Sequence, residues 1–127
     1  MIYLFKYMKY VLIPVLIIIT LGVLSPWPIK TKSIEAYITA YSLEDSCHFE
    51  GCVNASGWVP SFGEVACPRD LALGTMVKIQ SEVYVCTDRY AKWVDEKRGL
   101  PTFDIFMEEH RDAKSFGIHK LKVEILN

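Results

Sequence analysis

The chain has no excess of basic residues, no Cys-x-x-Cys motif, and no internal repeat or low-complexity segment. Its formal net charge is −1 at pH 7, but residues 33–127 hold 10 Lys and Arg against 15 Asp and Glu. Because nucleic-acid-binding proteins present a basic patch or stripe, this acidic balance excludes DNA and RNA from the expected partners. A length of 127 residues predicts a single domain with a small core.

Cysteine is scarce, with only four in the chain, and all of them lie behind the apolar N-terminal segment. An even count in a small domain of this kind favours disulfides, each worth about 2–4 kcal/mol, and four cysteines allow three pairings. Free buried thiols and a zinc site at Cys47, His48 and Cys52 are the less favoured alternatives. We expect no metal and no cofactor. The disulfide candidates are Cys47, Cys52, Cys67 and Cys86.

One long apolar run, Tyr10 to Leu24, follows a short tail that carries Lys6 and Lys9. With the apolar residues before it, the run approaches the roughly 18–20 residues that span a bilayer. Pro26, directly after the small-residue site, disfavours signal cleavage, so we expect a single-pass membrane anchor, with secretion after cleavage as the alternative. The cysteines place the domain outside the cytoplasm. The expected order is a tail (1–9), the anchor or signal peptide (10–25), a linker (26–33) and the domain (34–127).

Short stretches of alternating apolar residues recur through the domain and predict β-strands. In residues 82–88, for example, the alternation places Asp88 on the same face as Tyr84 and Cys86. About six such strands and one short helix indicate a mainly β, closed or nearly closed small barrel, since closure removes exposed strand edges. The expected strands are 33–42, one ending at residue 67, 75–79, 82–88, 102–106 and 120–126, with a turn at 80–81, a helix over 107–117 and loops elsewhere.

Seven segments between about residues 34 and 126 resemble a known bacterial family in their order and spacing. They are ITAYS, NASG, GEVACPRDLALGTMVKI, VYVCTDR, FDIF, AKSFG and VEIL. The family is the 3D domain, named for three aspartates, which is similar to the barrel of membrane-bound lytic transglycosylase A within the RlpA-like double-psi β-barrel superfamily. The resemblance implies a six-stranded double-psi β-barrel in the cell envelope that cleaves or binds peptidoglycan.

Two of the three family aspartates have counterparts in this chain. The second matches Asp88 and the third matches Asp104, whereas at the first position Cys67 precedes Pro68 and the nearest acid is Asp70. The Asp-Thr-Gly-Gly stretch of the family is also replaced, by RYAKWVDEKRGLP after the second aspartate. These departures concern the substrate contacts rather than the fold.

Cleavage of a glycosidic bond requires protonation of the leaving oxygen while positive charge builds on the sugar ring. In the transglycosylases that the chain resembles, one acid/base suffices because the sugar's own 6-hydroxyl attacks and a 1,6-anhydro product forms. The resemblance places this acid at Asp104, whose pKa burial or a negative neighbour such as Asp88 would have to raise. In the alternative interpretation, each aspartate accepts backbone N–H groups or pairs with Arg89 or Arg98.

Four aromatic side chains near the aspartates, Tyr41, Trp58, Trp93 and Tyr90, are candidates for stacking on sugar faces, although Tyr41 and Trp58 also suit plain packing. The expected function is cleavage of peptidoglycan glycan strands, with Asp104 as general acid and Asp88 assisting. The rival is a non-catalytic wall-binding module of the expansin type, which the missing first aspartate favours, and a third is a structural envelope factor. The expected substrate-binding residues are Tyr41, Trp58, Arg89 and Trp93.

Overall fold

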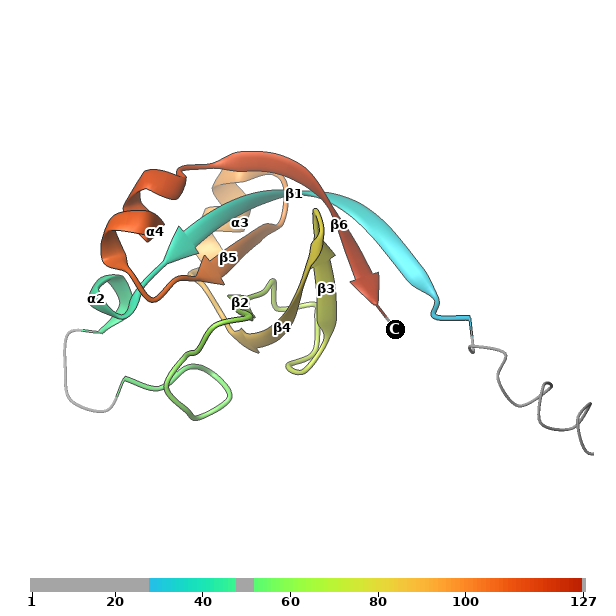
Figure 1. Ribbon diagram of the computed structural model, residues 1–127. Helices are drawn as coiled ribbons and strands as arrows, with labels where there is room; N and C mark the ends of the chain where they lie inside the picture. The colour runs from blue at the N-terminus through green and yellow to red at the C-terminus, as the bar shows by residue number, and fades with distance from the viewer. Residues whose placement is uncertain (1–27, 48–51, 127) are drawn as a thin grey trace, which may run out of the picture.

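The computed structural model describes residues 28–47 and 52–126. The six strands close into a mixed barrel in the order β1-β5-β2-β4-β3-β6 (Figure 1), which confirms the expected mainly β, six-stranded closed barrel. The elements are β1 Thr31–Tyr41, α2 Leu43–Ser46, β2 Glu64–Ala66, β3 Met76–Ile79, β4 Glu82–Asp88, α3 Lys92–Arg98, β5 Thr102–Phe106, α4 His110–Phe116 and β6 His119–Leu126.

The expected membrane anchor at residues 10–25 lies outside the described residues. Across residues 28–47 and 52–126, no helix has the length and apolar character that crossing a membrane requires.

Two parallel strand pairs give the barrel its mixed character. β1 pairs with β5 and β2 with β4 in parallel, whereas β1–β6, β2–β5, β3–β4 and β3–β6 are antiparallel. Closure gives each of these short strands a partner on both sides, so their backbone N–H and C=O groups are paired without an open edge. The hairpin between β3 and β4 turns at Gln80, which has a φ of 57°, as the turn predicted at 80–81 requires.

Alternate residues of the strands fill the interior of the barrel. Ile38 of β1, Phe103 of β5 and Val123 of β6 are completely buried, in agreement with the period-two patterns in the sequence. Because Phe103 and Ile105 belong to this core, the intervening Asp104 faces the other side of β5. A smaller apolar cluster lies on that side and consists of Tyr41, Ala66 and Phe106, with Leu43 and Tyr90 packed against it.

All four cysteines form disulfides, Cys47–Cys52 and Cys67–Cys86, which confirms the prediction from their even count. His48, the histidine of the zinc alternative, lies outside the described residues. The Cα atoms of Cys67 and Cys86 lie 5.6 Å apart, and both residues belong to the barrel core. Disulfides persist in oxidising compartments, so these two indicate an extracytoplasmic domain.

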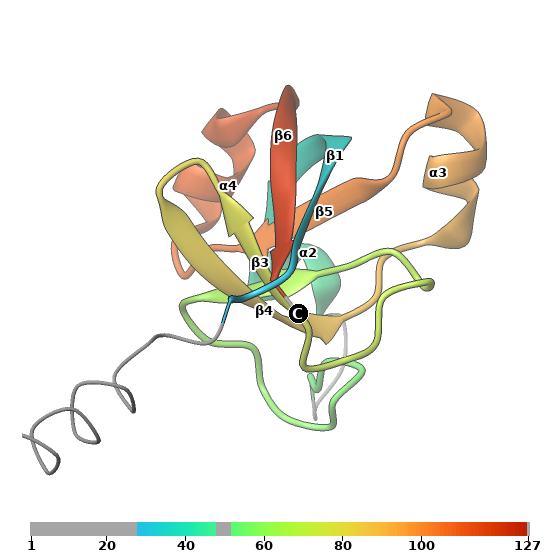
Figure 2. The ribbon, with the colours of Figure 1, turned by 90° about the vertical axis from the view of Figure 1, so that its right-hand side faces the viewer.

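The helices differ most from the sequence-based expectation. The helix predicted over 107–117 begins only at His110, because the N–H of Met107 donates to the carbonyl of Tyr41 and keeps the chain extended beyond β5. Gly117, with a φ of 75°, ends it as predicted. Helices α2 and α3 form in stretches expected to be loops; α2 lies beside α4, while α3 stands apart from both (Figure 2).

Candidate functional site

Asp88 and Asp104 lie in one row of side chains that crosses four neighbouring strands. Asp104 on β5 pairs with Thr39 on one side and with Ala66 of β2 on the other, and Ala66 also pairs with Asp88 of β4. Directly paired residues project from the same face of a sheet, and adjacent strands lie about 4.8 Å apart. The methyl group of Ala66 therefore separates two carboxyl side chains that point from one surface.

A register shift between β2 and β4 brings Asp88 into this row. Val65 pairs with Cys86, but the next residue of β2, Ala66, pairs with Asp88, so Thr87 is the extra residue of β4. Without the shift Asp88 would share the core-facing side of Cys86, and this is the arrangement that simple alternation predicted. That prediction was wrong because the extra residue reverses the face on which the following side chain lies.

The two aspartates line a cavity of about 210 Å³ on the outer side of the barrel wall. Three of the lining residues are aspartates. The lining residues are Tyr41, Asp45, Ser46, Ala66, Asp88, Arg89, Tyr90 and Asp104.

The carboxyl of Asp104 accepts a hydrogen bond of 2.7 Å from the hydroxyl of Thr39. Burial raises the pKa of Asp104 above its usual value, and the negative charges of Asp45 and Asp88 raise it further, against the opposing effects of Thr39 and Arg98. A carboxyl whose proton is retained to higher pH suits general acid chemistry.

The carboxylate of Asp88 divides its contacts between backbone and cavity. Its Oδ1 accepts the N–H groups of Ala55 at 3.0 Å and Arg89 at 2.8 Å, while Oδ2 accepts the hydroxyl of Tyr41 at 3.3 Å. Burial, followed by the charge of Asp88, raises the pKa of Tyr41, so its hydroxyl stays a donor. The backbone-binding interpretation of Asp88 therefore holds for one oxygen, and the other oxygen faces Tyr41 in the cavity wall.

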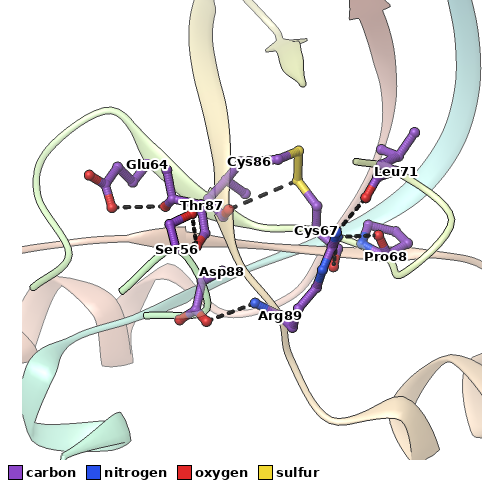
Figure 3. The surroundings of a disulfide bond; sticks show 10 residues. Ser56, Glu64, Cys67, Pro68, Leu71, Cys86, Thr87, Asp88 and Arg89 are labelled. Atoms are coloured by element: carbon purple, nitrogen blue, oxygen red, sulfur yellow. Dashed lines mark hydrogen bonds between the residues drawn. A yellow bond between two sulfur atoms is a disulfide. The ribbon is translucent and has the colours of Figure 1, made fainter. Parts of the chain in front are cut away.

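Arg89 lines the cavity, but its guanidinium turns away toward the loop that follows β2. It donates to the carbonyls of Pro68 at 2.7 Å and Leu71 at 2.5 Å, with a longer contact of 3.4 Å to Cys67 (Figure 3). The observed role of Arg89 is thus to hold this loop, and a substrate-binding role stays a prediction.

The predicted sugar-stacking residues separate into two groups. Tyr41 lines the cavity and packs edge-on against Phe106, whereas Trp58 and Trp93 are 51% and 64% exposed and do not line it. Trp58 donates its ring N–H to Glu64, and Trp93 lies on α3. The structure therefore brings Tyr41 and Arg89 to the two aspartates and leaves both tryptophans outside the cavity.

Asp45 and Ser46 line the cavity without having been among the residues proposed from the sequence, whereas Tyr90, which also lines it, was one of the stacking candidates. The signal for Asp45 was the spacing Ser42-x-x-Asp45, which is similar to a capping box and predicts a helix start. The amide and hydroxyl of Ser42 both donate to Asp45 at 2.9 Å, and this contact helps to hold the four-residue helix α2. Sequence reasoning treated this stretch as a loop and missed its carboxylate.

Glu64 at the start of β2 is a buried carboxylate that organises the loop beside Asp88. Four side chains donate to it at 2.8–3.0 Å. In the same loop, the hydroxyl of Ser56 donates to the carbonyl of Thr87, the extra residue of β4. Both the backbone and the side chain of Thr87 therefore bond to this segment. The donors to Glu64 are Asn54, Trp58, Ser61 and Thr87.

We expect Glu64→Gln to lower the free energy of unfolding at pH 7 by about 1–3 kcal/mol, because an amide cannot accept all four donors. Burial alone would raise the pKa of Glu64, but the donors Thr87, Trp58 and Ser61 lower it overall. A lowered folded-state pKa contributes stability above the unfolded value, and this is lost as the pH falls through the folded value. Urea unfolding at pH 7 and pH 3 should therefore show the deficit shrinking in acid.

The matched control is Glu82→Gln, which changes an exposed residue at the start of β4. An equal deficit in both variants, or one that does not depend on pH, would contradict the assigned role of Glu64.

No family model matches the chain, and the search of curated proteins found no match.

Proposed function

We propose that the chain is a cell-envelope protein with a double-psi β-barrel that cleaves peptidoglycan glycan strands in the manner of a lytic transglycosylase. The observation that carries the proposal is the position of Asp104, whose carboxyl lines a cavity beside Asp88 in surroundings that raise its pKa. The closed six-stranded barrel with two parallel pairs is consistent with the double-psi fold. The two disulfides support a location outside the cytoplasm.

In the proposed reaction Asp104 donates its proton to the glycosidic oxygen as the bond from that oxygen to C1 breaks. The 6-hydroxyl of the same sugar forms the new bond to C1 and returns its proton to Asp104, which completes the cycle without water. Asp88 stabilises the positive charge that develops on the sugar ring, and the hydroxyl of Tyr41 holds the Asp88 carboxylate in place. The chain would act from the membrane surface through the anchor proposed at residues 10–25.

A non-catalytic wall-binding module is the second candidate, and the size of the cavity favours it. Its volume of about 210 Å³ lies below the roughly 300–1,000 Å³ of typical small-molecule sites. The exposed rings of Trp58 and Trp93 add apolar surface outside the cavity on which sugars could stack. Such a surface would grip a glycan strand without breaking it.

The two candidates predict different results when the full chain, purified in detergent, is incubated with peptidoglycan sacculi. If the chain is a transglycosylase, mass analysis of the soluble fraction will show muropeptides with 1,6-anhydro ends. Sedimentation of the chain with sacculi, without soluble products, would replace this proposal with the wall-binding one. If the chain neither sediments with sacculi nor releases soluble products, both candidates are ruled out.

A further inference from the structure

We infer that Asp45 is a positioning residue for Asp104: from helix α2 it places a carboxylate in the same cavity that the Asp104 carboxyl lines. The inference rests on the proposed function, because it assigns Asp104 the role of the acid. Asp45 touches neither the glycosidic oxygen nor the sugar in this scheme and acts through Asp104 alone.

Asp45 reaches the cavity from an element outside the barrel wall. Helix α2 begins two residues after β1 ends at Tyr41, and Asp45 and Ser46 line the cavity together with Asp88 and Asp104 of the strands. The cavity thus has carboxyl groups on strand β4, strand β5 and helix α2. The Asp45 side chain is 38% exposed, so solvent screens part of its effect on Asp104.

Hydrogen bonds from two elements hold the Asp45 carboxylate in position. Its Oδ2 accepts the amide and the hydroxyl of Ser42, each at 2.9 Å, and lies 3.4 Å from Nδ1 of His110 at the start of α4. Nδ1 of His110 lies 2.9 Å from the Ser42 hydroxyl, so a neutral ring can donate to that oxygen while Ser42 donates to Asp45. These contacts, in the part of the chain that the structure describes, all engage Oδ2.

The same contacts keep Asp45 ionised. Burial would raise its pKa, but the donors on Ser42 and the nearby His110 lower it overall, so the carboxylate is charged through the neutral range. Asp104 experiences the opposite balance, because burial raises its pKa and the charge of Asp45 adds to the rise. The two carboxyls thus differ in protonation: Asp104 retains its proton to higher pH, and Asp45 stays ionised.

Other charged groups around the pair are accounted for in the test. Asp88 on β4 also favours protonation of Asp104, while Arg98 of α3 opposes it. His110 of α4 faces Asp45 and Glu44, at 3.4 Å and 3.8 Å, and a positive charge on its ring would offset theirs. The Asp45 effect is therefore measured over a wide pH range, in alkaline as well as in acid solution.

The test is a carboxyl NMR titration of Asp104 in the full chain and in Asp45→Asn, which keeps an oxygen acceptor for Ser42. The midpoint of Asp104 should fall in the variant because the neighbouring negative charge is gone. Glu44→Gln is the matched control: it removes one charge from the same helix, at a residue that does not line the cavity, and should leave the midpoint unchanged. Circular dichroism verifies that both variants are folded.

An unchanged Asp104 midpoint in Asp45→Asn would overturn the inference, as would an equal fall in Glu44→Gln, which would show a general charge effect. The titration needs no substrate, so its outcome is independent of whether sacculi are cleaved. Where cleavage is observed, Asp45→Asn should shift the alkaline limb of the pH–rate profile to lower pH and leave the acid plateau in place. A uniform loss of rate at every pH would instead assign Asp45 a structural role.

Discussion

Asp104→Asn is expected to lower the rate at which anhydro products are released from sacculi by about 10²–10⁴-fold, the usual contribution of a general acid. The amide cannot donate a proton to the leaving oxygen or take one from the 6-hydroxyl. In the wild-type chain the rate should fall as the pH rises through the pKa of Asp104, because the protonated form is the active one. The raised pKa therefore extends activity to higher pH. Product mass analysis over a pH series measures both effects.

A stability measurement on Asp104→Asn shows whether a loss of activity results from the missing proton donor or from unfolding of the domain. Burial raises the folded-state pKa of Asp104, so its protonated form stabilises the fold at low pH, and this contribution is lost as the pH rises through the folded value. The amide stays neutral at every pH and keeps an oxygen for the hydroxyl of Thr39. The variant should thus equal or exceed the wild type in thermal stability at pH 7. A stable variant with full activity would show that Asp104 is not the acid.

Removal of the core disulfide, in Cys67→Ala/Cys86→Ala, should lower the free energy of unfolding by about 3 kcal/mol, because the unfolded chain gains the entropy of an opened loop. The ends of this loop are 19 residues apart. For a domain of this size each kcal/mol lowers the Tm by about 4–8 °C, so the Tm should fall by about 12–24 °C. The two residues are 1% and 0% exposed, and the space left by their sulfur atoms adds to the loss. Differential scanning calorimetry measures the change.

The second disulfide provides the internal comparison. Cys47→Ala/Cys52→Ala opens a loop whose ends are only 5 residues apart, and the same entropy relation gives about 2 kcal/mol. The Tm of this variant should therefore fall less than that of the core variant. The reverse order would contradict the view that Cys67–Cys86 is the principal covalent support of the barrel.

The core disulfide keeps position 67 out of the cavity. The side chain of Cys67 turns into the barrel core to meet Cys86. A carboxyl in that place would have to be buried without its charge solvated, at high cost. The third carboxyl of the cavity comes from Asp45 on α2.

The strands follow from the sequence because they rest on local information, and their number indicated a closed barrel. Residues such as Ile38 and Phe103 alternate with polar neighbours, and that period matches a strand with one face in a core. Gly117 marked the end of a helix for a similarly local reason, since its backbone adopts a positive φ. The even number of cysteines also indicated disulfides before any partner was known.

Only the tertiary structure decided which side chains meet in the cavity. Asp88 faces Asp104 because β4 holds one extra residue against β2, and strand register is set by distant partners such as Ala66 and by the bond from Thr87 to Glu64. Asp45 enters the cavity because α2 folds against α4, although four residues are too few to form a helix alone. The alternation of residues along one strand does not indicate how that strand is aligned with its neighbour in the sheet. A shift of one residue in this alignment moves a side chain to the opposite face.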